Sequence, residues 1–189
     1  MARIVHCLLL LLFSCLLCWQ PQAHAGSIDI SYARIESSDD GYRLAASFNF
    51  ELSRDLENTL TSGIPLYFTT EVEITHPRWY WFDEKTIVSD QTVRISYNVL
   101  TRQYRASVNG SFSQNYKDLD DALALVRHPS RWIIAEKSSL SHGAIYNVAI
   151  RSRLDTSQLP KPLQFNALNN SDWRLASEWK RMTFKADDK

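Results

Sequence analysis

The stretch "YRLAASFNFEL", residues 42–52, decides the fold, because apolar and polar side chains alternate along it. The apolar side chains stand at every second position, namely Leu44, Ala46, Phe48, Phe50 and Leu52. Successive side chains of a β-strand point to opposite faces, so this period of two predicts a strand with one buried face and one face in water. Strands of this kind are typical of antiparallel sheets.

The same alternation recurs in four later runs, which predict four more strands. Their apolar positions are Ile64, Leu66, Phe68, Val72 and Ile74; Val93, Ile95, Tyr97 and Val99; Tyr104, Ala106 and Val108; and Tyr146, Val148, Ile150 and Leu154. Turn-forming residues separate the runs at "SSDDG" (37–41), "LTRQ" (100–103) and "SHG" (141–143). We therefore predict an all-β fold, an antiparallel β-sandwich, with a partly closed β-barrel as the alternative.

Two short helices are expected between these strands. Ser53 can cap a helix in "SRDLENTLTSG" (53–63), which Gly63 would end. Asp118 can cap a second helix in "DLDDALALVRHP" (118–129), which Pro129 would stop. The apolar stripes of both helices are narrow, as in helices that cover a sheet.

The end of the chain carries two further expectations. In "LDTSQLPKPLQ" (154–164), Pro160 and Pro162 cannot donate backbone hydrogen bonds. We expect this segment to be an edge strand or an extended crossover. The tail "FKADDK" (184–189) is expected to fray.

The first 25 residues have the organisation of a signal peptide. Arg3 gives a basic start, "LLLLLFSCLLCW" (8–19) is an apolar run, and "AHA" (23–25) places small residues at the cleavage positions. We predict cleavage before Gly26 and a periplasmic or secreted protein with a single β-rich domain over residues 26–189. The apolar run is short for a bilayer, so no membrane span is expected after cleavage.

Composition argues against several classes of function. The three cysteines all lie in the leader, so no disulfide is expected in the remainder. Without Arg3, 20 basic and 21 acidic residues remain, and no basic excess predicts nucleic-acid binding. His76, His128 and His142 are not at metal-ligand spacing, so we expect neither a metal nor a cofactor.

The stretch "PRWYWFDEK" (77–85) is the most concentrated group of aromatic residues. If it is extended, Trp79 and Trp81 point to one face and Tyr80 and Phe82 to the other. Burial statistics favour a core role for these rings. The alternative is an exposed aromatic patch for a sugar, a peptide or a partner protein.

Arginine beside tryptophan is the second candidate pattern for recognition. Arg78 and Arg131 each directly precede a tryptophan. The guanidinium group of an arginine can stack on an aromatic ring and bind a carboxylate at the same time. The candidate binding residues are therefore Arg78, Trp79, Trp81, Arg131 and Trp132.

An ordered set of motifs resembles one protein family. The motifs are "GIPLYF" (63–68), "RWYWFDEK" (78–85), "RISYNVLTRQYR" (94–105), "RW" (131–132) and "RSRLDTSQLPKPLQ" (151–164). Together they resemble the exported proteobacterial proteins described as domain of unknown function 4390. The resemblance implies no activity, cofactor or catalytic residue. It does imply an association with a membrane sensor kinase of the nitrogen-regulation type, whose gene often lies nearby in this family.

Two functions follow as hypotheses. The first is a non-catalytic binding or accessory protein of the bacterial envelope, with an envelope protein partner and a place beside a membrane sensor kinase. The alternative is an envelope hydrolase that uses carboxylates. A deep cleft with two facing acids and a raised carboxyl pKa would favour the hydrolase, and a shallow aromatic patch without them would favour binding.

Overall fold

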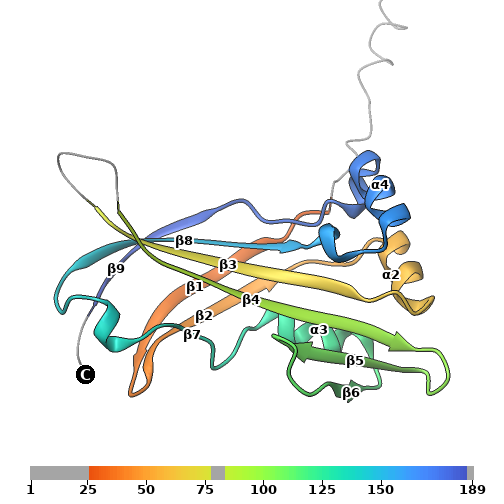
Figure 1. Cartoon of the computed structure of the whole chain (residues 1–189), viewed down its shortest axis with the longest axis horizontal. Helices are drawn as coiled ribbons and strands as arrows, with labels where there is room; N and C mark the ends of the chain where they lie inside the picture. Colours follow the sequence, from red (N-terminus) through yellow and green to blue (C-terminus); the bar gives the residue numbers. More distant parts are fainter. Residues whose placement is uncertain (1–25, 78–83, 187–189) are drawn as a thin grey trace, which may run out of the picture.

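Two antiparallel sheets form the protein in the computed structural model, which describes residues 26–77 and 84–186 (Figure 1). The smaller sheet has the strand order β1-β2-β7 and the larger has the order β6-β5-β4-β3-β8-β9. The strands are β1 (Asp29–Ser38), β2 (Gly41–Asn49), β3 (Leu66–His76), β4 (Glu84–Asn98), β5 (Gln103–Val108), β6 (Gln114–Tyr116), β7 (Ile133–Ala135), β8 (Ile145–Leu154) and β9 (Lys180–Lys185). The prediction of an antiparallel sandwich is confirmed, and the sheets do not close into a barrel over the described ranges.

The core lies between the sheets and is built by the alternating residues. The largest fully buried side chains come from both layers, among them Tyr42, Phe48, Phe68, Ile74, Ile95 and Ile150. Two aromatic contacts join elements of the two layers, with ring centroids 5.2 Å apart for Tyr42 and Phe184 and 5.6 Å apart for Phe50 and Phe68. Aromatic rings bury large areas, so these contacts contribute strongly to holding the layers together.

Both predicted helices are confirmed, as α2 (Arg54–Thr61) and α3 (Leu119–Arg127). The side chain of Ser53 accepts a hydrogen bond from the backbone of Leu56 at 3.3 Å, which satisfies one of the free amides at the start of α2. Asp118 stands at the N-cap of α3 without a side-chain capping bond. Leu56 and Leu60 are fully buried, so α2 uses its apolar stripe to cover the core.

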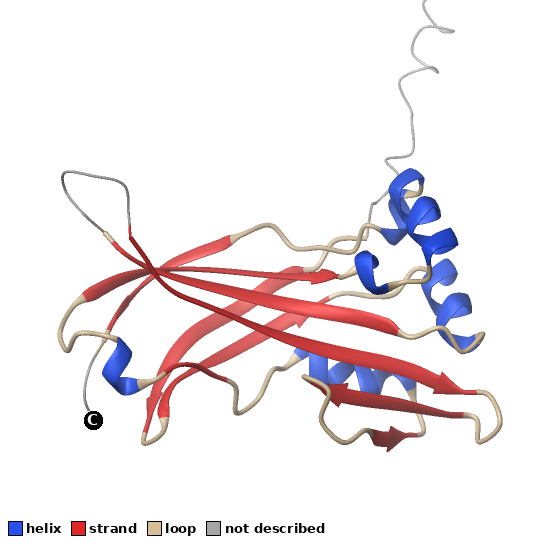
Figure 2. Ribbon diagram, viewed as in Figure 1, coloured by secondary structure: helices blue, strands red, loops and turns tan. Residues whose placement is uncertain are grey.

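A third helix, α4 (Lys161–Asn169), replaces the predicted edge strand or extended crossover. That prediction was wrong, because the segment forms a 3₁₀ turn, η2 (Thr156–Gln158), and then a helix whose first turn contains Pro162. Proline suits the first turn of a helix, where its missing N–H would have no partner. The carbonyl oxygen of Pro160 accepts from the amide of Leu163 at 2.9 Å. Helices α2 and α4 lie at the same end of the sandwich (Figure 2).

One edge strand of the larger sheet is β9. Its last two residues, 184–185, belong to the tail that was expected to fray. Phe184 belongs to this strand and packs on Tyr42, and Ala186 is fully buried. The amide of Ala186 donates to the carbonyl oxygen of Ala144 at 3.0 Å. Apolar contacts therefore hold the start of "FKADDK" in the fold. Two further 3₁₀ turns are η1 (Lys137–Ser139) and η3 (Ser171–Trp173).

Two of the three predicted turns lie where strands reverse, and the third, "SHG" (141–143), precedes β8. The "SSDDG" turn joins β1 to β2, and "LTRQ" lies in the hairpin between β4 and β5. Gly41, at the end of the first turn, has φ +140°, and a Cβ there would lie 2.4 Å from the carbonyl oxygen of Ala135 in β7. Only glycine allows β7 to approach β2 this closely.

Gly41→Ala should therefore destabilise the protein by about 2 kcal/mol or more, because the new methyl group collides with the β7 backbone at an unfavourable φ. Gly110→Ala is the matched control, since Gly110 has φ +71° but no atom within 4 Å of an added Cβ. Its cost should be about 1 kcal/mol from backbone strain alone. Urea unfolding of the two variants measures the difference, and equal losses would contradict the collision.

Candidate functional site

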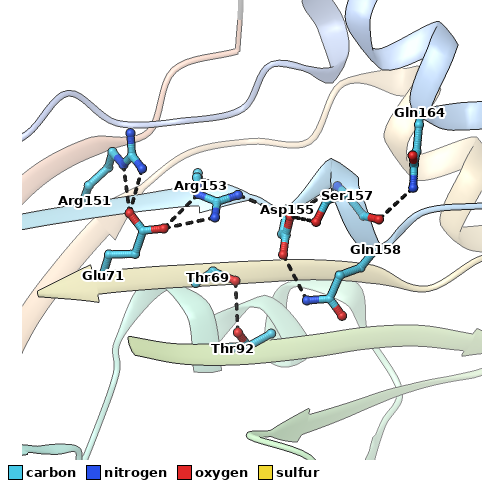
Figure 3. A network of polar contacts seen from close by, with 9 residues as sticks. All are labelled: Thr69, Glu71, Thr92, Arg151, Arg153, Asp155, Ser157, Gln158 and Gln164. Atoms are coloured by element: carbon cyan, nitrogen blue, oxygen red, sulfur yellow. Dashed lines mark hydrogen bonds and ion pairs between the residues drawn. The ribbon is translucent and has the colours of Figure 1, made fainter. Parts of the chain in front are cut away.

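The outer face of the larger sheet carries a row of charged residues. In β3 and β8 the alternation that buries Val72 and Ile150 turns their neighbours outward, and the strand register places Glu71 opposite Arg151 and Thr69 opposite Arg153. Figure 3 shows these side chains together on one side of the sheet. The same pairing that builds the core thus assembles a polar cluster on the opposite face.

Glu71 bridges two arginines. Arg151 donates to its Oε2 from Nη2 at 2.7 Å and from Nε at 3.2 Å. Arg153 donates from Nε to its Oε1 at 3.0 Å, and Nη1 of Arg153 lies 3.3 Å from Oδ1 of Asp155. The result is the chain Arg151–Glu71–Arg153–Asp155, in which each inner charge has an opposite charge on both sides (Figure 3).

These contacts shift the pKa values of the charged groups in the cluster. Burial raises the pKa of Glu71, but the hydrogen bonds and charges of Arg151 and Arg153 outweigh it, so the pKa lies below its usual value. Burial opposes the charge of Arg153 too, yet Glu71 and Asp155 raise the pKa of this guanidinium above its usual value. The pKa of Asp155 is also lowered: burial raises it, while hydrogen bonds from Ser157 and Gln158 and the charge of Arg153 lower it.

Asp155 links the cluster to the helical end of the sandwich. Its Oδ1 accepts from the hydroxyl of Ser157 at 2.6 Å and from the amide of Ser157 at 3.2 Å, and its Oδ2 accepts from Nε2 of Gln158 at 3.0 Å. Gln164 of α4 donates from Nε2 to the carbonyl oxygens of Ser157 at 2.7 Å and Leu159 at 2.8 Å. Asp155 therefore caps η2 and holds the connection from β8 to α4.

A groove of about 590 Å³ lies beside this cluster on the same face. Among the side chains that line it are Glu73, Thr75, Asn147, Ala149, Trp179, Arg181 and Thr183. The guanidinium carbon of Arg151 lies 4.7 Å from the centroid of the Trp179 ring, a cation–π contact. Because Glu71 holds Arg151, the indole ring has a fixed neighbour. The volume of the groove lies within the range of small-molecule sites, about 300–1,000 Å³.

A second, smaller hollow of about 370 Å³ adjoins the same tryptophan. It is lined by residues 27–30, at the start of β1, and by residues 176–180, before and at the start of β9. The side chain of Lys180 donates to the carbonyl oxygen of Ile30 at 2.7 Å, so the two sheets meet here. Trp179 lines both hollows.

Neither carboxylate of the cluster has the raised pKa of a general acid. A general acid must be protonated near the working pH, which requires a raised carboxyl pKa. Glu71 and Asp155 have lowered pKa values, and their oxygens already accept hydrogen bonds from arginine, serine and glutamine side chains. No group of three or more potential metal ligands occurs within residues 26–77 and 84–186. In the same ranges, no helix has the length and apolar character that crossing a membrane would need.

Of the residues predicted from sequence, the described ones, Arg131 and Trp132, do not line the groove or join the charged cluster. Arg78, Trp79 and Trp81 lie outside the described residues. Trp132 is only 7% exposed and belongs to the core, and its carbonyl oxygen accepts from the amide of Leu44 at 3.1 Å. Arg131 is exposed at φ +58°, in the turn that precedes β7 of the smaller sheet. Arg131 and Trp132 thus belong with the other layer of the sandwich.

Sequence reasoning missed Glu71, Arg151, Arg153, Asp155 and Trp179. A signal existed for the two arginines, because they alternate with the buried Ile150, Ser152 and Leu154 and so had to share the wet face of β8. Nothing in the sequence paired that face with Glu71, because the two strands are 80 residues apart and their register is a tertiary property.

The fold and the groove together define a class: an antiparallel β-sandwich whose larger sheet presents a polar, tryptophan-lined groove on its outer face. The family model described as "Domain of unknown function (DUF4390)" matches residues 25–183, and the chain belongs to this family. This confirms the resemblance seen in the motifs. Searches of curated proteins and of solved structures found no significant match.

Glu71→Gln should destabilise the protein by about 1–2 kcal/mol at neutral pH, because a neutral amide cannot compensate two guanidinium groups. Glu36→Gln is the control, because its partner Arg34 is 64% exposed. This variant should lose less than about 0.5 kcal/mol of unfolding free energy. Chemical denaturation at fixed pH measures both.

The same pair of proteins gives a pH test. Glu71 has a depressed pKa in the folded state, so its stabilisation is complete above its usual pKa of 4.5 and is lost as the pH falls through the lower folded-state value. The stability difference between the parent and Glu71→Gln should therefore shrink on acidification below about pH 4.5. A difference that stays constant down to pH 2 would show that ionised Glu71 does not stabilise the fold.

Proposed function

We propose that this protein is a non-catalytic binding or accessory module of the bacterial envelope, and that it binds its ligand in the outer groove. One observation carries the proposal: Trp179 stands at the groove wall with its ring held by Arg151, which Glu71 holds in turn. A ring that is ordered before binding loses little conformational freedom on contact, and this favours affinity.

The electrostatics of the face support a binding role. The charged cluster beside the groove is internally compensated, and the groove lining itself carries one acid, Glu73, and one base, Arg181. Recognition then depends on shape, on the indole ring and on placed hydrogen-bonding groups, as in small-molecule sites.

The envelope setting is part of the proposal and rests on sequence. The leader-like residues 1–25 support export, and the place beside a membrane sensor kinase is what the motif resemblance implies. In this role the groove would present or sense an envelope component for a protein partner.

Affinity purification from the envelope of the native host tests the role, with the full-length gene expressed and the bound compounds identified by mass spectrometry. The parent should retain a compound that Trp179→Ala loses. Phe165→Ala is the control, because Phe165 is 68% exposed on α4, outside the groove lining, and this variant should retain the compound.

Two results would contradict the proposal. The first is equal retention by the parent and Trp179→Ala. The second is turnover of an envelope component by the parent that Glu71→Gln or Asp155→Asn abolishes while both variants remain folded, since this would make the cluster catalytic.

A further inference from the structure

Strand β1 is the long free edge of the smaller sheet, and it lacks the protection that the other edges have. Among the described residues, β6 and β7 are edge strands of three residues each, and β9 begins with Lys180 and ends with Lys185. Short strands and lysines are devices that prevent an edge from pairing with another chain. β1 spans ten residues, and from residue 32 to residue 38 it contains neither proline nor lysine and keeps a regular register.

The register shows which backbone groups of β1 point outward from the sheet edge. The amide of Leu44 in β2 donates to the carbonyl oxygen of Trp132, directly before β7, at 3.1 Å. The backbone groups of Leu44 therefore point away from β1, and its antiparallel partner Ile35 is in a non-hydrogen-bonded pair. Both backbone groups of Ile35 thus point to the free edge, and so do those of Ala33, two residues earlier on the same strand.

These backbone groups have no partner in the described parts of the chain. The neighbour of β1 in the sheet is β2 alone, and no backbone hydrogen bond outside that ladder involves Ala33 or Ile35 within residues 26–77 and 84–186. A lysine closes the start of the edge, where Nζ of Lys180 donates to the carbonyl oxygen of Ile30 at 2.7 Å. Beyond this lysine, Ala33 and Ile35 offer two N–H donors and two C=O acceptors at the spacing of a β-ladder.

The outer face of the same strand carries a self-complementary pair of charges. Arg34 and Glu36 form an ion pair along the strand, with 64% and 41% of their side chains exposed. When two copies of β1 pair antiparallel about Ile35, the Arg34 of each copy lies opposite Glu36 of the other. These are non-hydrogen-bonded positions of the new ladder, where side chains lie closest, so each charge gains a second opposite neighbour. A pairing centred on Arg34 would instead place two arginines opposite each other.

We propose that β1 is a homodimerisation edge: two copies of the chain pair their β1 strands antiparallel about Ile35. The two smaller sheets then form one sheet with the strand order β7-β2-β1-β1-β2-β7. A second copy is favoured over a strand of another protein, because the two-fold pairing matches both the free backbone groups and the charges of β1 to themselves. This inference goes beyond the proposed binding function and does not depend on it.

Sedimentation equilibrium of protein expressed from the full-length coding sequence tests the pairing. The parent should dimerise with a dissociation constant of about 100 µM or tighter. Arg34→Glu and Glu36→Arg should each weaken dimerisation at least about tenfold, because like charges then face each other across the pairing. An equimolar mixture of these two variants should regain the dimerisation of the parent, since the acids of one chain then face the bases of the other.

Two further variants separate this edge from other surfaces. Ala33→Pro removes an outward-pointing donor at an edge position, where proline is tolerated, so it should remain folded and weaken dimerisation at least about tenfold. Arg102→Glu is the charge control, because Arg102 is exposed in the turn between β4 and β5 of the larger sheet. This variant should leave dimerisation unchanged.

Three results would overturn the inference. The first is a parent protein that remains monomeric at about 300 µM; if affinity purification from the envelope then retains a polypeptide that Ala33→Pro loses, the edge belongs to another protein. The second is a dimer that Arg34→Glu, Glu36→Arg and Ala33→Pro leave unchanged, since another surface would then form it. The third is a mixture of the two charge variants that stays monomeric while thermal unfolding shows both to be folded.

Discussion

The register between β3 and β8 is the constraint on which the rest of the structure depends. Val72 lies opposite Ile150 and Glu71 lies opposite Arg151, so one alignment produces both the apolar layer and the charged cluster. A hydrogen bond of 3.1 Å between the hydroxyls of Thr70 and Ser152, both buried, adds a polar pair to the core side of this alignment. A slip by one residue would turn the arginines into the core, where their charges would have no adequate partners.

The charged cluster also organises its surroundings. Through Arg151 it orders Trp179 at the groove, and through Asp155 it caps η2 and reaches α4. A single chain of contacts thus connects the candidate binding wall with the helices at the end of the sandwich.

Glycine and proline constrain this fold in ways that local sequence patterns predict only in part. Gly41 permits the close approach of β7 to β2, which only the contact with Ala135 reveals. Pro160 and Pro162 argued against a central strand, and the segment is indeed not one; however, the same residues are compatible with the first turn of α4. A proline shows that its own nitrogen donates no hydrogen bond. It does not determine whether a strand, a loop or a helix follows.

The sequence by itself determined the strand-rich fold, the solvent-exposed and buried faces of the strands, the starts of α2 and α3, and membership of the family. These features are local, because the alternation, caps and turn residues act within a few positions along the chain. Only the tertiary structure decided that Glu71 meets Arg151 and Arg153, that Trp132 is core, and that Trp179 stands beside a groove. Those outcomes depend on which strands become neighbours and in what register, and many distant pairings share the same local pattern.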